Sequence, residues 1–266
     1  MARAYYIVKL NGAIPDEKKS RMNLQSSHSP VLPASSLQAY LLGSVGFESA
    51  LAFQRRLLYQ VAGERDHGAI LLCEHMPLIT VGRHGSSAHI LYEPGELRAR
   101  RWQVRWVNRG GGCVLHLPGQ LVIYPILALD RLGLDLRTYM ARLKTILGTV
   151  LGEFDVRAEA RDNEIVVGGR RIATIGVAVR QWVSYYGAIL NVNPDLLPFR
   201  GIRSSSAYPE VTSLARERRG ALRPSLVRER LLEHFAASFQ FSRTAVFFDH
   251  PSLSPKTPAD AIAASS

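Results

Sequence analysis

The sequence predicts an α+β fold, a single domain built on a mixed, largely antiparallel sheet that is backed by helices. Segments with the two-residue period of strands outnumber those with the helical period, and short hairpin turns recur between them. The 266 residues, 47% of them hydrophobic, are enough to bury one sizeable core. Because hairpins join antiparallel neighbours, a doubly wound parallel sheet is not expected.

The first half of this domain opens with a helix and continues with strands. Phe47, Leu51 and Leu58 fall on one helical face. The strands that follow are expected at residues 70–73, 78–81, 102–107 and 121–125.

The second half begins with a strongly amphipathic helix over residues 136–154, capped by Asp135. A two-glycine turn at 168–169 predicts a hairpin between strands at 165–167 and 172–179. A further strand is expected at 182–192, and a last helix starts at Ser225 and continues through Phe235.

The two ends of the chain differ from this middle part. Residues 1–36 are polar and interrupted by proline and serine, so we expect a largely disordered extension in which residues 5–8 could form a short strand. Residues 246–266 are expected to be a flexible tail, which leaves residues 37–245 as the folded domain.

Composition limits the function classes. The sequence has neither the apolar core of a signal peptide nor an apolar run of about 18 residues, and two cysteines make no disulfide framework. A cytoplasmic protein is therefore expected, without a membrane partner. The formal net charge of +11 would suit nucleic acid, but the arginines are scattered, so an acidic protein partner is favoured.

Residues 109–121, with the sequence RGGGCVLHLPGQL, are the most informative segment. Three successive glycines leave a backbone without side-chain walls, against which a thin ligand can lie. The segment is neither a phosphate loop nor a dinucleotide-binding turn, because the lysine and the following helix of those motifs are missing. A glycine-rich bend between two strands is the alternative interpretation.

Five further segments occur with this one in a fixed order. They are residues 71–83, 169–177, 185–195, 198–199 and 211–214. In order and spacing the set resembles the lipoyl(octanoyl) transferases of the lipoate-biotin ligase superfamily, from about Leu37 to about Phe239. The resemblance implies a lipoate/biotin ligase-like fold, with a smaller sheet beside the large one.

The resemblance also implies a function. Members of this family move an octanoyl group from acyl carrier protein to a lysine of lipoyl domains, which occur in 2-oxoacid dehydrogenases and in the glycine cleavage H protein. The carrier and the lipoyl domains are the expected partners, and neither a metal nor another cofactor is implied. We expect a monomer.

Two residues depart from the family where its chemistry lies. The family uses a cysteine as nucleophile and a lysine that keeps it ionised; here Arg171 occupies the lysine position. Counting from Phe199 places Ser205 at the cysteine position, whereas counting back from residues 211–214 places Ser204 there. A serine is not ionised without a general base, which a protonated arginine cannot be.

Other side chains could supply the missing base or nucleophile. His116 matches the family's histidine and is the candidate base, with a structural hydrogen bond as its alternative role. Cys113 lies within the glycine segment and could replace the nucleophile, whereas Cys73 lies in an apolar strand and is expected to be packing.

The acyl-binding surface implied by the resemblance matches the family better than the catalytic pair does, although Leu117 and Tyr186 are departures. It comprises Arg109, Gly110, Gly111, Gly112, Cys113, Val114, Leu115, His116, Thr174, Ile175, Gly176, Gly187, Ala188 and Ile189.

Octanoyl transfer is the function that these features predict. A catalytically degenerate homologue that binds an acyl chain or its carrier without transfer is the main alternative. An ATP-dependent lipoate ligase is disfavoured because those relatives depend on a lysine at the position of Arg171.

Overall fold

The computed structural model describes residues 6–8, 36–64, 67–203, 208–250 and 253. Most of the predicted N-terminal extension and most of the predicted C-terminal tail lie outside these residues. Tyr6–Val8 and Arg243–Phe247 are nevertheless paired strands, so ordered backbone reaches into both.

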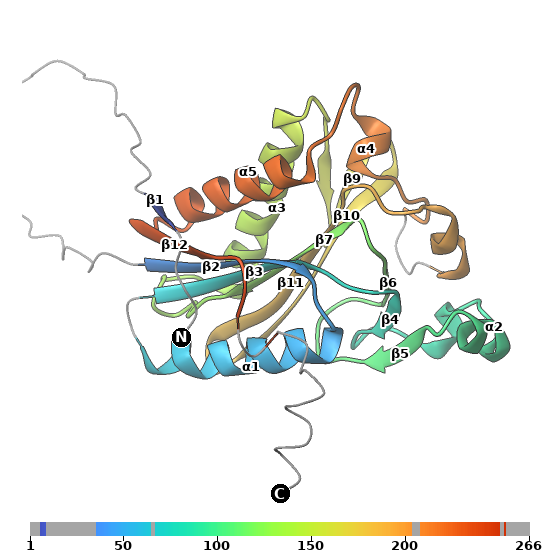
Figure 1. Cartoon of the computed structure of the whole chain (residues 1–266), viewed down its shortest axis with the longest axis horizontal. Coiled ribbons are helices and arrows are strands. Elements are labelled where there is room, and N and C mark those ends of the chain that lie inside the picture. Colours follow the sequence, from blue (N-terminus) through green and yellow to red (C-terminus); the bar gives the residue numbers. More distant parts are fainter. Residues whose placement is uncertain (1–5, 9–35, 65–66, 204–207, 251–252, 254–266) are drawn as a thin grey trace, which may run out of the picture.

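A nine-stranded sheet forms the centre of the described molecule (Figure 1). Its strands, from one edge to the other, are β1 (Tyr6–Val8), β12 (Arg243–Phe247), β2 (Ser36–Ser44), β3 (His67–Glu74), β7 (Gln120–Ile126), β11 (Val183–Asn191), β10 (Arg170–Arg180), β9 (Glu164–Val167) and β8 (Glu159–Arg161). β2 pairs in parallel with β12 and with β3, and the other neighbouring pairs are antiparallel. The predicted mixed, largely antiparallel sheet is confirmed.

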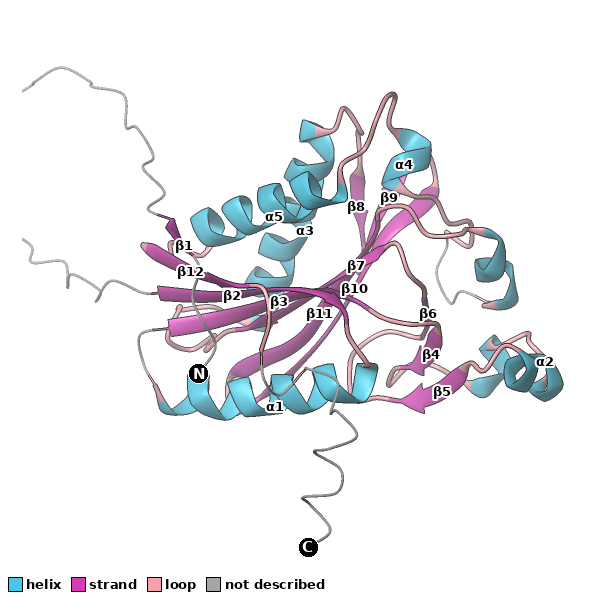
Figure 2. Cartoon of the chain, in the orientation of Figure 1, coloured by secondary structure: helices cyan, strands magenta, loops and turns pink. Residues whose placement is uncertain are grey.

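Helices cover both faces of this sheet (Figure 2). α1 (Phe47–Gly63) lies on one face, and α3 (Leu136–Glu153) and α5 (Pro224–Ser238) lie on the other. Two hydrophobic cores result, one between the sheet and the α3–α5 pair and one between the sheet and α1. The Asp135 side chain accepts a hydrogen bond from the Thr138 N–H at 2.7 Å, which confirms the predicted cap of α3.

The smaller sheet contains β5 (Gln103–Trp106), β4 (Leu78–Val81) and β6 (Cys113–His116). The short helix α2 (Pro94–Ala99) lies beside it, and α4 (Leu214–Glu217) precedes α5 in the chain. A third hydrophobic cluster, centred on Ile79, Leu115 and Ile202, forms the core of this smaller sheet. Because β6 and β7 are consecutive in the chain, the turn at Pro118 and Gly119 connects the small sheet to the large one.

Candidate active site

The glycine segment is fixed against the large sheet by its backbone. The Gly110 N–H donates to the Val177 carbonyl of β10 at 2.9 Å. A Cβ atom on Gly176 would lie 2.8 Å from the Gly110 carbonyl oxygen, so the neighbouring strand needs glycine for this approach. The predicted segments 109–116 and 174–176 are therefore in direct contact.

The same loop is held on its other side by the residues that follow β4. The N–H groups of Gly82, Arg83 and His84 donate to carbonyls of the glycine segment at 3.0–3.1 Å. Gly111 has a φ of 84°, in the left-handed region, where a residue with a Cβ atom is strained. Glycine at these positions thus lets the loop backbone pack closely against β10 and the residues after β4.

Two cavities lie between the glycine loop and the strands β10 and β11. The outer cavity has a volume of about 230 Å³, and the inner one of about 20 Å³. Val114, Thr174 and Ile189 line both, so the inner cavity continues the outer one toward the α1 side. Of the fourteen residues predicted to bind the acyl group, all but Gly110 line one or both cavities.

Arg109 is a buried cation beside the inner cavity. Its guanidinium donates to the Thr80 carbonyl at 3.1 Å, to Thr80 Oγ1 at 2.7 Å and to the Gly110 carbonyl at 2.9 Å. Burial lowers the pKa of Arg109 to about 10, which leaves it protonated at neutral pH. This side chain ties the glycine loop to β4.

His116 lies in the same buried region. Thr80 Oγ1 is 3.0 Å from its Nε2, and Nδ1 is enclosed without a hydrogen-bond partner among the described residues. Burial, with His75 and Arg109 nearby, holds the pKa of His116 well below its usual range, so the ring is neutral. His116 lines the inner cavity and Arg171 lines the outer one, so these two predicted catalytic residues do not line the same cavity.

Arg171 is held in an ion pair at the wall of the outer cavity. Its Nη1 is 3.1 Å from Glu164 Oε1 and donates to the Tyr208 carbonyl at 3.4 Å. Its backbone N–H donates to the Glu210 carbonyl at 2.8 Å. The candidate nucleophiles Ser204 and Ser205 lie outside the described residues, and Tyr208, which follows them in the chain, contacts Arg171 through its carbonyl oxygen.

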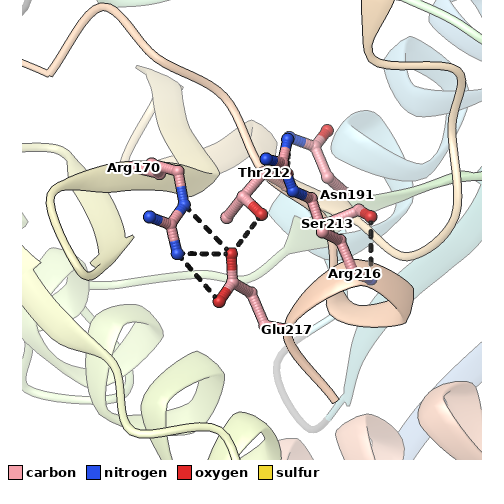
Figure 3. A network of polar contacts seen from close by, with 6 residues as sticks. All are labelled: Arg170, Asn191, Thr212, Ser213, Arg216 and Glu217. Carbon is pink, nitrogen blue, oxygen red and sulfur yellow. Dashed lines mark hydrogen bonds and ion pairs between the residues drawn. The ribbon is translucent and has the colours of Figure 1, made fainter. Parts of the chain in front are cut away.

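A polar network fixes residues 212–217, which follow Tyr208 in the chain (Figure 3). The Glu217 carboxylate accepts hydrogen bonds from Nε and Nη2 of Arg170 at 2.9–3.1 Å. The Thr212 hydroxyl donates to the same carboxylate. The Asn191 amide donates to the Thr212 carbonyl at 3.0 Å. This network joins residues 212–217 to β10 and β11, next to Arg171.

Replacing Glu217 by glutamine should loosen this attachment. The amide cannot match the charge-assisted fork with Arg170, so we expect the free energy of unfolding to fall by about 1–3 kcal/mol. Denaturant unfolding measures this loss. Glu229→Gln in α5, for which the structure gives no hydrogen bond or ion pair, is the control and should change the unfolding free energy little. Equal effects of the two changes would contradict the network's role.

The two cysteines differ in environment. Cys113 is half-buried, lines the outer cavity and donates its thiol to the Ser86 carbonyl at 3.3 Å, and burial raises its pKa. Cys73 is buried in the core, and burial raises its pKa strongly. Neither thiol is therefore ionised at neutral pH, which weakens Cys113 as a replacement nucleophile.

Several residues of the cavities were not singled out from the sequence. They are His84, Gln120, Asp162, Asn163, Glu164 and Asn191 in the outer cavity, and Phe47, Thr80 and Tyr124 in the inner one. Glu164 matters most, because its carboxylate lies beside Arg171. The hairpin turn at 168–169 was the available signal, since it places residues before and after the turn on adjacent strands.

No three His, Cys, Asp or Glu side chains gather as a possible metal site in the part of the chain that the structure describes. Among the same residues, no helix is both long and apolar enough to span a bilayer.

Solved structures place this fold among the lipoate protein ligases. Lipoate-protein ligase A bound with ATP has a TM-score of 0.64 at 16% identity, covering 86% of this chain and 93% of the other. A bipartite lipoate protein ligase from Thermoplasma acidophilum has a TM-score of 0.58 at 15% identity, covering 86% and 91%. At these identities the likeness concerns the fold alone.

Sequence comparison gives the family. The lipoyl protein ligase A/B catalytic domain matches residues 47–236, and the chain belongs to this family. The octanoyltransferase of Geobacter metallireducens is 42% identical over 163 residues, which are 60% of this chain and 73% of that protein. The octanoyltransferase of Citrifermentans bemidjiense is 38% identical over 204 residues, which are 75% of this chain and 93% of that protein.

Proposed function

We propose that the protein is an octanoyltransferase, an acyltransferase that moves an octanoyl group from acyl carrier protein to a lysine of lipoyl domains. The two joined cavities carry this proposal, because they form a narrow pocket that opens beside Arg171 and ends among buried side chains. The acyl chain enters through the outer cavity of about 230 Å³, and its last carbons reach the inner cavity.

Ser205 is the proposed acyl acceptor, with Ser204 as the alternative. Its hydroxyl oxygen attacks the thioester carbonyl, the carbon–sulfur bond breaks, and the hydroxyl proton passes to the departing carrier thiol. The lysine amine of the lipoyl domain then attacks the resulting oxyester, forming the amide and restoring the serine hydroxyl. Glu164 supports this proposal, because its carboxylate lies at the wall of the outer cavity, where it can take the hydroxyl proton and pass it to the departing carrier thiolate.

In this proposal Arg171 stabilises the negative charge that develops on the carbonyl oxygen. Because arginine stays protonated, it cannot exchange protons with the attacking and leaving groups as lysine can. An oxyester is also a poorer acyl donor to an amine than a thioester. We therefore propose slow transfer. The serine and arginine also favour the second candidate, a homologue that binds the acyl chain or its carrier without transferring it.

The proposed donor is octanoyl-acyl carrier protein, and the proposed acceptors are the lipoyl domains of 2-oxoacid dehydrogenases and the glycine cleavage H protein. Acidic carriers would be attracted by the net charge of +11. A cytoplasmic monomer is part of the proposal; both cysteines are free thiols, as in proteins of reducing compartments.

Binding of octanoate tests the pocket independently of turnover. At ten times its Kd, octanoate should stabilise the protein by about 1.4 kcal/mol, which raises Tm by about 3–6 °C. Gly111→Val should abolish this shift, because a β-branched side chain is strained at a φ of 84° and would displace the loop.

Gly110→Ala is the matched control for that experiment. A Cβ atom on Gly110 would meet only the Val177 carbonyl oxygen, at an ordinary 3.6 Å, and Gly110 lines neither cavity. The octanoate shift should therefore survive. If millimolar octanoate leaves the Tm of the unmodified protein unchanged, the pocket assignment is wrong.

A further inference from the structure

The inner cavity is the deep end of the pocket, because most of its lining residues are buried, and this lining limits how far a ligand can enter. Its volume of about 20 Å³ corresponds to about one water molecule. Phe47, Tyr124 and Tyr186 close it with aromatic rings. Removing a ring from this position would therefore lengthen the pocket, and enlarging one would shorten it.

Tyr186 stands out among these rings because its backbone is strained. Its φ is 54°, in the left-handed region that bulky residues avoid. Such conformations persist only where the surroundings enforce them, and they concentrate at ligand sites. The side chain is only 4% exposed.

The contacts around this backbone are unusually close. A Cβ atom on the adjacent Gly187 would lie 2.2 Å from the Ile123 carbonyl oxygen and 2.5 Å from Pro125 Cδ, so β11 and β7 are in unusually close contact. The Tyr186 N–H donates to Gln54 Oε1 of α1 at 2.9 Å. As a result Tyr185 and Tyr186 both pack into the core on the α1 side, although successive strand residues normally face opposite sides.

Two neighbouring rings hold the Tyr186 ring in place. Its centroid is 6.4 Å from that of Tyr124 in an edge-to-face arrangement and 5.1 Å from that of Tyr185. We propose that Tyr186 determines acyl-chain length, because its ring forms the end wall against which the last carbons of the chain lie. This inference rests on the proposed function and adds the residue that sets the substrate's length.

The test measures binding of hexanoate, octanoate, decanoate and dodecanoate by thermal shift to the full-length protein. The unmodified protein should bind octanoate best. Tyr186→Gly relieves the backbone strain and removes the ring, so the preferred chain should become at least two carbons longer. Decanoate should then gain about tenfold in affinity over octanoate, as expected for two more buried methylene groups. Tyr186→Trp should shift the preference toward hexanoate.

Two controls separate this role from a general effect on folding. Tyr186→Phe keeps the ring and should keep the octanoate preference. Tyr185→Leu changes the adjacent ring, which lines neither cavity, and should also keep it. If Tyr186→Gly does not fold, Tyr186→Leu gives the lengthened pocket.

An unchanged length preference in both the enlarged and the shortened variants, with octanoate still bound by the unmodified protein, would overturn the inference and leave the proposed function intact. Failure of the unmodified protein to bind any of the four acids would overturn both.

Discussion

Replacing Ser205 by cysteine and Arg171 by lysine together is expected to raise octanoyl transfer to a lipoyl domain by about 10²–10⁴-fold, the range that a positioned proton-transfer group contributes. A thiol is far more acidic than a hydroxyl, and a nearby cation favours its ionised form. Lysine can also pass a proton to the leaving thiol and accept one from the amine, which arginine cannot. The rate is measured from the intact mass of the lipoyl domain over time.

The single variants locate the effect. Ser205→Cys alone should form acyl-enzyme at an intermediate rate, because Arg171 still supplies positive charge. The two changes should be non-additive, because both residues belong to the proposed catalytic site. Glu164→Gln should slow the unmodified protein more than the double variant, whose nucleophile no longer needs a carboxylate base. Transfer by the unmodified protein at about 1 s⁻¹ or faster would contradict the proposed limitation.

Gly187→Ala is expected to have the largest effect on stability, lowering the free energy of unfolding by about 3 kcal/mol or more, at the upper end of overpacking costs. The added Cβ atom would lie 2.2 Å from the Ile123 carbonyl oxygen, which is backbone and cannot rotate away. β11 would have to separate from β7 at the centre of the sheet. Urea unfolding followed by circular dichroism measures the loss.

Gly43→Ala in β2 is the matched control, because a Cβ atom there would meet nothing within 4 Å. It should leave the unfolding midpoint nearly unchanged or raise it slightly. Equal midpoints for the two alanine variants would show that the strands tolerate the contact at Gly187.

Local sequence signals predicted the elements that local chemistry determines. Gly168 and Gly169 both have positive φ, as a tight two-residue hairpin turn requires, and β9 and β10 pair across them as expected. Asp135 caps α3 because a carboxylate placed just before an amphipathic run can accept a hydrogen bond from an unpaired N–H of the first helical turn. The glycine segment was recognisable because consecutive glycines are costly unless a close approach needs them.

Features that depend on distant partners were not predictable. The strand at residues 78–81 was expected, but nothing local shows that β3 and β4 belong to different sheets. β2 was missed, together with its parallel pairing to β12, because that partner lies some two hundred residues along the chain. The left-handed backbone of Tyr186 contradicts the preference of tyrosine itself and accompanies contacts with distant segments, namely the hydrogen bond to Gln54 and the close approach of Gly187 to β7.

The site was only partly predictable, because some of its contacts also depend on the register of neighbouring strands. The pocket residues follow from consecutive motif positions, so nearly all of them line the cavities. Glu164 and Arg171 lie on adjacent strands of the predicted hairpin, but the sequence does not reveal the register shift between Arg171 and Ala173, which places Glu164 opposite Thr174.

The intact mass of the protein after incubation with octanoyl-acyl carrier protein tests the central claim, that residue 205 receives the acyl group beside the pocket. The unmodified protein should slowly gain the mass of one octanoyl group. Ser205→Ala should gain none, whereas Ser204→Ala and Cys113→Ser should still be acylated. No adduct on the unmodified protein, or an adduct that survives Ser205→Ala, would contradict the account.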